Sequence, residues 1–450
     1  MSTSLVRHAP PAWKPIPTLE DPRFAGLLAY GQEKDPLGDV VHAWIAGLAF
    51  GLQPLSPVAA WIGLAILAGY AVLRLHATWR CLPLLLRSPL MLAWLAMAIW
   101  SLLAIIWSSD PAEGIDRVGV LRVLFLITAT WPVLHRWRTI VFGMAGGSAV
   151  QMIFQLLMYL GLMENINETH SVWTITGGLS RHTGNTAVWA SASACLMLGI
   201  AMEKKGGWFW AIALGSCCIG SVILAGSRTL FLAIPLAMII QAIVSSIGNE
   251  VSRRRKRIVL GVISLGLLGL VALPLIAPTS IPVQRINAMM GEIERAWNAE
   301  RYIDYGTSSG LRWFWWRESI EIIPGRPVVG YGSGSFRLEF DRHLAAQKDI
   351  PSTLPDKFYC DNPHSTIVLE LVEGGVIGLL IWGAIFSLGF LGAWQTSIRT
   401  PGLAGLVGGW TVLFVYGISN SLQLSGFTMS LLAVLVVLSI RQPTSITVET

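Results

Sequence analysis

Residues 208–247 read WFWAIALGSCCIGSVILAGSRTLFLAIPLAMIIQAIVSSI, which is two long apolar runs separated by a short turn, Ala225-Gly226-Ser227-Arg228-Thr229. A helix that crosses a bilayer needs roughly 17–25 predominantly apolar residues, and each run is about that long. The stretch therefore predicts two membrane-spanning helices that meet at a tight turn.

The composition extends this prediction to the whole chain. Of its 450 residues, 53% are hydrophobic and only 13% are charged, whereas soluble domains carry about 25% charged residues. This balance excludes a soluble enzyme, a disordered protein and a nucleic-acid-binding module. We expect an all-α polytopic membrane protein with about twelve transmembrane helices, near residues 40–54, 55–74, 89–107, 118–134, 139–161, 186–202, 208–226, 229–247, 258–277, 375–395, 402–420 and 425–440.

The positive charges predict the orientation. Alternating spans place most Lys and Arg clusters on one face, including the basic run 253–257, whose simplest role is to anchor the topology. Positive loops face the cytoplasm, so both termini are expected there. The predicted organisation is a cytoplasmic tail (1–39), helices one to nine (40–277), a periplasmic loop domain (278–374), helices ten to twelve (375–440) and a cytoplasmic tail (441–450).

The loop 278–374 is too long for a simple connection, and its patterns predict a mainly helical folded layer. Helices are expected near 283–302 and 311–323, with Pro324-Gly325 ending the second. Four consecutive aromatic residues at 313–316 suit an interfacial position on that second helix. The alternating glycines at 330–334 indicate a tight turn with close backbone approach.

His364 is the candidate catalytic base. Asn362 is a good helix N-cap and Pro363 a good first-turn residue, so His364 is expected in the first turn of a helix. The positive end of the helix disfavours imidazolium there, which keeps a ring nitrogen available as a proton acceptor. The alternative is a hydrogen-bonded structural histidine.

Arginines on the same outer face are candidate anion ligands. Arg228 lies in the tight turn, Arg181 just before the sixth span, and Arg312 on a predicted helix without an acidic partner one turn away. Guanidinium groups bind phosphate bidentately, so a pyrophosphate at the membrane surface would suit them, although Arg228 and Arg181 could instead contact lipid headgroups. His182, Arg317 and Asn362 are supporting candidates, and Arg317 is also placed to form an ion pair with Glu321.

The order of several motifs is similar to that of the O-antigen ligase and polymerase superfamily of bacterial inner membranes. The resemblance runs from about the fifth to the eleventh span. The motifs are Arg181-x-x-Gly184-Asn185, Ala225-Gly226-Ser227-Arg228-Thr229, Ser309-Gly310-Leu311-Arg312, Pro327-Val328-Val329-Gly330-Tyr331-Gly332, Asn362-Pro363-His364-Ser365 and Glu373-Gly374-Gly375-Val376-Ile377-Gly378. A proline directly before His364 departs from many relatives.

This resemblance implies a GT-C-like glycosyltransferase with no cofactor. The donor would be an undecaprenyl-pyrophosphate-linked glycan. The acceptor would be lipid A–core for a ligase, which we favour, another glycan repeat for a polymerase, or a Ser or Thr hydroxyl for a protein O-oligosaccharyltransferase. His364 would be the base, while Arg228 and Arg312, assisted by Arg181, would hold the pyrophosphate. No D-x-D pair is present to chelate a metal, so a metal-independent, inverting displacement is expected.

A transporter or flippase is the rival interpretation. Twelve spans are common in transporters, but those proteins typically have ionisable residues near the bilayer midplane and repeat-related broken helices. The candidate charges here lie at the outer boundary of the predicted spans, which favours interfacial chemistry.

Overall fold

The computed structural model describes residues 33–116, 120–164, 177–180, 183–203, 207–247, 275–299, 305–347 and 358–440, with residue 355 and scattered positions between 257 and 268. All regular structure in these ranges is helical. The main helices that match predicted spans are α2 (Pro36–Leu52), α3 (Pro57–Leu73), α5 (Pro89–Ala104), α7 (Val120–Thr130), α8 (Trp137–Tyr159), α9 (Thr183–Ala201), α10 (Trp208–Ala225), α11 (Arg228–Ile247), α17 (Gly375–Arg399), α18 (Gly405–Ile418) and α19 (Gly426–Ser439).

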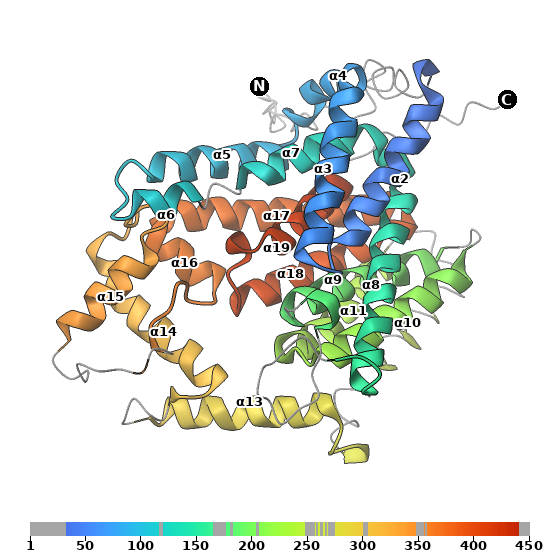
Figure 1. The fold of residues 1–450 in the computed structure, drawn as a ribbon. Coiled ribbons are helices and arrows are strands. Elements are labelled where there is room, and N and C mark those ends of the chain that lie inside the picture. Colours follow the sequence, from blue (N-terminus) through green and yellow to red (C-terminus); the bar gives the residue numbers. More distant parts are fainter. Residues whose placement is uncertain are drawn as a thin grey trace, which may run out of the picture.

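Six helical stretches in the described ranges are long and apolar enough to cross a membrane, and α2, α3, α5 and α19 are shorter apolar helices. One of the six, Arg122–Tyr159, is a 38-residue stretch that covers two predicted spans. Its two parts meet at the 3-10 helix η1 (Trp131–Arg136), where Val133 has non-helical angles, and α7 and α8 run in different directions beyond it (Figure 1). The predicted span 258–277 falls mainly outside the described residues, so the count of twelve stays a prediction.

Helices α2 and α8 pack backbone against backbone. Gly47 and Gly51 on α2 face Gly143 and Gly147 on α8, and a Cβ atom at either α8 glycine would overlap the carbonyl group of its α2 partner. Small residues four apart allow close approach of helices where lipid supplies no hydrophobic driving force. This contact positions the first helices against the rest of the bundle.

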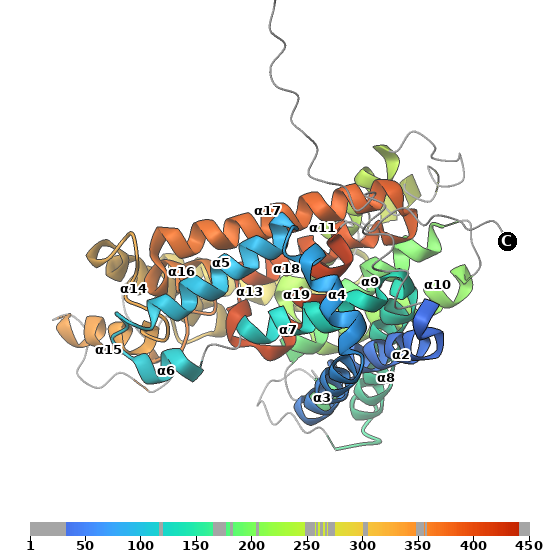
Figure 2. The same cartoon turned by 90° about the horizontal axis from the view of Figure 1, so that it is seen from above.

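A second layer covers one end of α5 and α17. It contains α6 (Pro111–Asp116), α13 (Ile281–Trp297), α14 (Ser308–Ile322), α15 (Phe336–Ala346) and α16 (Thr366–Glu373). Figure 1 shows α14, α15 and α16 gathered at that end, with α13 running beneath them toward α11, and Figure 2 shows α5 lying along α17. The helices predicted near 283–302 and 311–323 are thus confirmed as α13 and α14.

The layer has its own hydrophobic core, and this corrects one expectation. Phe314 and Trp315, two of the four consecutive aromatics, are buried with Phe336, Phe340 and other residues of α14 to α16. The motif was predicted to lie at the lipid interface. Half of it instead fills the interior of the layer, because consecutive positions on a helix point to different faces.

The glycines at 330–334 form a tight turn with close backbone approach, as their pattern predicted, and this turn joins the layer to the helix bundle. Gly330, Gly332 and Gly334 all have positive φ, and a Cβ at Gly332 would overlap Ser108. Tyr331 N–H donates to the Val372 carbonyl at 2.8 Å. The turn thereby contacts the junction between α16 and α17. At this junction α17 begins at Gly375, which has φ +64°.

Candidate active site

Three arginines and one histidine line a cavity of about 720 Å³. Its walls come from α9, α11, α13, α14, α18, the turn before α16 and the loop before α19. The charged or titratable residues that line it are Arg228, Arg285, Arg312, His364 and Tyr416. The structure therefore brings together three of the residues predicted from separate segments, namely Arg228, Arg312 and His364.

Arg228 is the first residue of α11. The turn before it is short because Gly226 ends α10 with φ +60°. The guanidinium forms a two-pronged ion pair with Glu292 on α13, with Nη1–Oε2 at 2.5 Å and Nη2–Oε1 at 2.9 Å. Nη1 also donates to Ser309 Oγ at 3.0 Å. Arg228 is thus a fixed cation at the cavity wall, oriented by two other helices.

Arg312 lies in the first part of α14, four residues after Ser308, where Thr307 Oγ1 caps the helix by accepting from Gly310 N–H at 3.1 Å. Within the described part of the chain, Arg312 has no hydrogen-bond or ion-pair partner. Burial, together with the nearby charge of Arg228, lowers the pKa of its guanidinium, although this group stays charged in proteins. An unpaired guanidinium that faces a cavity is ready to bind an anion.

His364 does not lie in the first turn of a helix, so that prediction is wrong. Helix α16 begins at Thr366, and Ser365 is its N-cap, with Ser365 Oγ accepting from Val368 N–H at 3.4 Å. Asn362 caps a local turn instead, because its Oδ1 accepts from the backbone N–H of His364 at 2.9 Å. His364 has φ +50°, the one positive φ of a non-glycine residue in the described ranges. Such strain concentrates at functional sites.

The His364 imidazole is neutral at physiological pH, for a different reason from the one predicted. Burial, followed by the positive charge of Arg312, lowers its pKa to about 4. The ring stacks on Trp315, with centroids 5.2 Å apart and planes inclined by 22°. In the described structure neither ring nitrogen has a hydrogen-bond partner. The arrangement leaves an unprotonated nitrogen free to accept a proton within the cavity.

Hydrogen bonds from α14 and from the loop between α18 and α19 hold the turn that carries His364. Trp316 Nε1 donates to the Pro363 carbonyl at 2.8 Å. On the other side, Ser421 Oγ accepts from Ser365 N–H at 3.2 Å, and Thr366 Oγ1 donates to the Asn420 carbonyl at 3.0 Å. The loop between α18 and α19 therefore holds the turn in place.

Three further predicted residues are not among the described lining of the cavity. Arg181 and His182 lie outside the described residues, although the following residues, Thr183 to Asn185, line the cavity. Arg317 is not among the cavity-lining residues. Its expected ion pair with Glu321 is wrong, because it pairs with Glu318 at 2.6 Å and donates to Tyr305 Oη at 2.6 Å.

Two residues of α13 were missed from the sequence. Arg285 lines the cavity and donates from Nε to the Gly226 carbonyl at 3.3 Å, and Glu292 binds Arg228. Their spacing of seven places both on one face of the helix. Burial would raise the pKa of Glu292, but hydrogen bonds from Arg228 and Ser309 outweigh it, so the pKa lies below its ordinary value.

No aspartate, glutamate or cysteine of the described chain lines the large cavity, so the described side chains of its lining offer nitrogen, hydroxyl and amide-oxygen groups but no carboxylate to a divalent cation. Glu318, Glu321 and His343 do lie close enough to one another to hold an ion. Their ligand atoms are already engaged with each other, with Arg317 and with Gln347. This cluster belongs to the α14–α15 contact rather than to the cavity lining.

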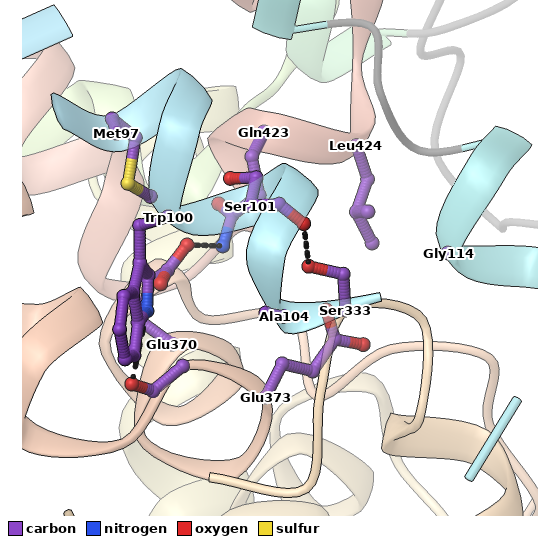
Figure 3. Close-up of a pocket in the computed structure, with 11 residues that line it drawn as sticks. Met97, Trp100, Ser101, Ala104, Gly114, Ser333, Glu370, Glu373, Gln423 and Leu424 are labelled. Atoms are coloured by element: carbon purple, nitrogen blue, oxygen red, sulfur yellow. Dashed lines mark hydrogen bonds between the residues drawn. The ribbon is translucent and has the colours of Figure 1, made fainter. Parts of the chain in front are cut away.

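A second, small cavity of about 40 Å³ is lined by residues of α5, α16 and the loop at Gln423 (Figure 3). Glu370 is buried beside it, and its Oε1 accepts from Trp382 Nε1 at 2.6 Å and from Gln423 Nε2 at 3.2 Å. Burial and the nearby Glu373 raise the pKa of Glu370 to about 8, although hydrogen bonds from Trp382 and Gln423 act in the opposite direction. This carboxyl joins α16 to α17 and to the loop that holds the His364 turn.

The described chain is all-helical, six of its helical stretches are long and apolar enough to cross a membrane, and its large cavity is basic and bears a histidine. Residues 210–383 match the sequence model of the O-antigen ligase family, and this match confirms the resemblance seen in the motifs of that segment. Members of this family are glycosyltransferase-like enzymes that act on lipid-linked glycans. A comparison with curated proteins found no match.

Proposed function

We propose that the protein is an O-antigen ligase that transfers a glycan from undecaprenyl pyrophosphate to a sugar hydroxyl of lipid A–core at the periplasmic face of the bacterial inner membrane. The observation that carries this proposal is the convergence of Arg228, Arg312 and His364 on one cavity. The family match over 210–383, which contains all three residues, supports a lipid-linked glycan as donor.

His364 is proposed to act as the general base. The acceptor hydroxyl oxygen attacks the anomeric carbon while its proton passes to a ring nitrogen of His364. The bond from that carbon to the pyrophosphate oxygen breaks, and its electron pair leaves on the pyrophosphate. A single displacement of this kind inverts the anomeric carbon. The lowered pKa of His364 leaves the ring unprotonated before the reaction, and the negative charge of bound pyrophosphate would raise that pKa toward the working pH, where a general base is most effective.

Arg312 and Arg228 are proposed to bind the donor pyrophosphate and stabilise the charge that develops on it. Arg312 is the stronger candidate because its guanidinium has no protein partner within the described structure. Arg228 is partly neutralised by Glu292 but retains N–H groups that this ion pair does not use. Arg181, two residues before a cavity-lining segment, is proposed to assist.

The test is a transfer assay with purified protein, a polyprenyl-pyrophosphate-linked glycan and lipid A–core. The product is detected by a gel shift of the acceptor. Wild type should give product, and His364→Ala should give none above background. His343→Ala is the matched control, since His343 lies in the same layer but pairs with Glu318 on α14. Turnover of His364→Ala near the wild-type rate would rule out the base assignment.

The same assay separates the related functions. Donor that lengthens in the absence of lipid A–core would indicate a polymerase. Glycan that appears on an added protein would indicate a protein O-oligosaccharyltransferase. No transfer by intact protein in lipid would favour a transporter.

A further inference from the structure

Glu292 lies behind the cavity wall and contacts two of the helices that form it. Its side chain is 11% exposed, and its carboxylate binds Arg228 of α11 through both oxygens. One of these oxygens also accepts from the backbone N–H of Ser309, in the first turn of α14, at 3.0 Å. Glu292 is therefore fixed next to the cavity without lining it.

The charges around the cavity are unbalanced without this residue. Arg228, Arg285 and Arg312 all line the cavity, and His364 is neutral. No carboxylate of the described residues lines it. Among the described residues, Glu292 offsets one of these three positive charges, which leaves a net charge of about two facing a ligand.

The lipid-linked donor and the spent lipid carrier of a transfer reaction differ in charge. A glycan-linked polyprenyl pyrophosphate is a diester with two ionised oxygens. The spent carrier that transfer leaves behind is a monoester with a third oxygen, which ionises with a pKa of about 6, as in other phosphate monoesters. Above that pH the product carries one negative charge more than the donor.

We propose that Glu292 is a specificity-determining residue that weakens the binding of the spent pyrophosphate carrier relative to the glycan-linked donor, and so promotes product release. This inference rests on the proposed function. The carboxylate repels each ligand in proportion to the ligand's charge, so its effect is larger on the triply charged product. It does so without touching the ligand.

The test compares two lipids that differ only in that charge. Farnesyl pyrophosphate represents the product, and farnesyl pyrophosphate joined through its terminal phosphate to N-acetylglucosamine represents the donor. Their dissociation constants are measured by calorimetry on the full chain in detergent, at pH 8.0 and pH 5.5. The variant is Glu292→Gln, because glutamine keeps a carbonyl oxygen for Ser309 N–H and removes the charge.

Glu292→Gln should lower the ratio of monoester to diester dissociation constants about tenfold at pH 8.0. At pH 5.5, where the third oxygen is protonated, the same substitution should leave the ratio near the wild-type value. If the glutamine variant does not fold, Glu292→Met replaces it. Methionine is neutral and of similar length, so this variant should change the ratio in the same way.

Two controls separate charge from structure. Glu292→Asp keeps the charge and should keep the wild-type ratio even if both lipids bind more weakly. Glu339→Gln removes a carboxylate that pairs with Arg342 on α15 at 2.7 Å, outside the cavity lining, and should change neither constant.

An unchanged ratio in folded Glu292→Gln at pH 8.0 would overturn the inference. An equal change at both pH values would also overturn it, because geometry rather than charge would then be responsible. Failure of wild type to bind either lipid would instead contradict the proposed function, and the inference with it.

Discussion

The imidazole of His364 lies stacked on the indole of Trp315, with ring centroids 5.2 Å apart. Trp315 belongs to α14, the helix that also carries Arg312. Its Nε1 donates to the Phe358 carbonyl at 2.9 Å, which fixes the indole against the segment that leads to His364. One helix therefore positions both the proposed base and the unpaired guanidinium, so a displacement of α14 would move both groups together.

Replacement of Trp315 tests this coupling. Trp315→Ala removes the surface that orients the imidazole, and we expect kcat to fall by about 10²-fold, the cost of a small misplacement of a reacting group. Trp315→Phe keeps an aromatic face but loses the hydrogen bond to Phe358, so its loss should be smaller. Both are measured in the transfer assay. Equal losses in the two variants would mean that the hydrogen bond, and not the stack, is responsible.

The pH dependence of kcat/KM should report the lowered pKa of His364. The base must be unprotonated, so activity is lost as pH falls through the pKa of the free enzyme. We expect the acidic limb to lie near pH 4, below the value of 6.5 for an unperturbed histidine. Bound pyrophosphate would favour imidazolium, so the corresponding limb in kcat should lie at higher pH. A limb of kcat/KM at 6.5 would contradict the buried environment of His364.

Arg312 should be the arginine most sensitive to substitution. Arg312→Gln is expected to lower kcat/KM by roughly 10²–10³-fold, as for loss of one donor to a developing anion. Arg312→Lys should recover only part of this, because a lysine keeps the charge but not the two-pronged geometry. Arg295→Gln is the control, since Arg295 lies exposed on α13. Activity of Arg312→Lys equal to wild type would reduce the role of Arg312 to charge alone.

Ionisation of Glu370 should set an alkaline limit to the transfer activity. With a pKa of about 8, the carboxyl is mainly protonated at neutral pH. Raising the pH through 8 ionises a buried group beside Glu373 and weakens the junction between α16, α17 and the loop at Gln423. We expect activity to fall reversibly across this range. Glu370→Gln, which imitates the neutral acid, should abolish the fall, and a fall that persists in this variant would exclude Glu370 as its cause.

Apolar patterns predicted the helices well because length and hydropathy are local properties. Nearly every predicted span that the structure describes matches a helix within a few residues. The tight turn at Gly226 also followed from the sequence, since only a residue tolerant of positive φ suits it. The close contact of Gly47 with Gly143 could not be predicted from the sequence. The spaced glycines are visible in each helix, but the two helices are far apart in the chain and no local pattern shows that they touch.

The candidate site was predicted in composition but not in contacts. Arg228 stood out because charge is rare at the edge of apolar spans, Arg312 because it has no acidic partner one turn away, and His364 because of its expected place at a helix start. Glu292, the partner of Arg228, could not be predicted. It lies 64 residues away in the chain, on a helix whose orientation no local pattern gives. The predicted start of α16 was wrong because Asn362 and Ser365 are both good caps. In the structure α16 starts later, and hydrogen bonds from Ser365 and Thr366 to the distant 420–421 segment accompany that start.

The attachment of the His364 turn to Asn420 and Ser421 has a consequence for how the protein matures. A ribosome delivers the chain from its N-terminus, so every charged group of the cavity is synthesised before the loop that fixes the turn. A newly made chain should therefore sit in the bilayer with its arginines and histidine present but stay inert until the α18–α19 hairpin has inserted. Premature termination near residue 418 would remove this loop together with α19, whose residues 428–439 are all buried in the bundle, so the truncated chain should be both inactive and less stable.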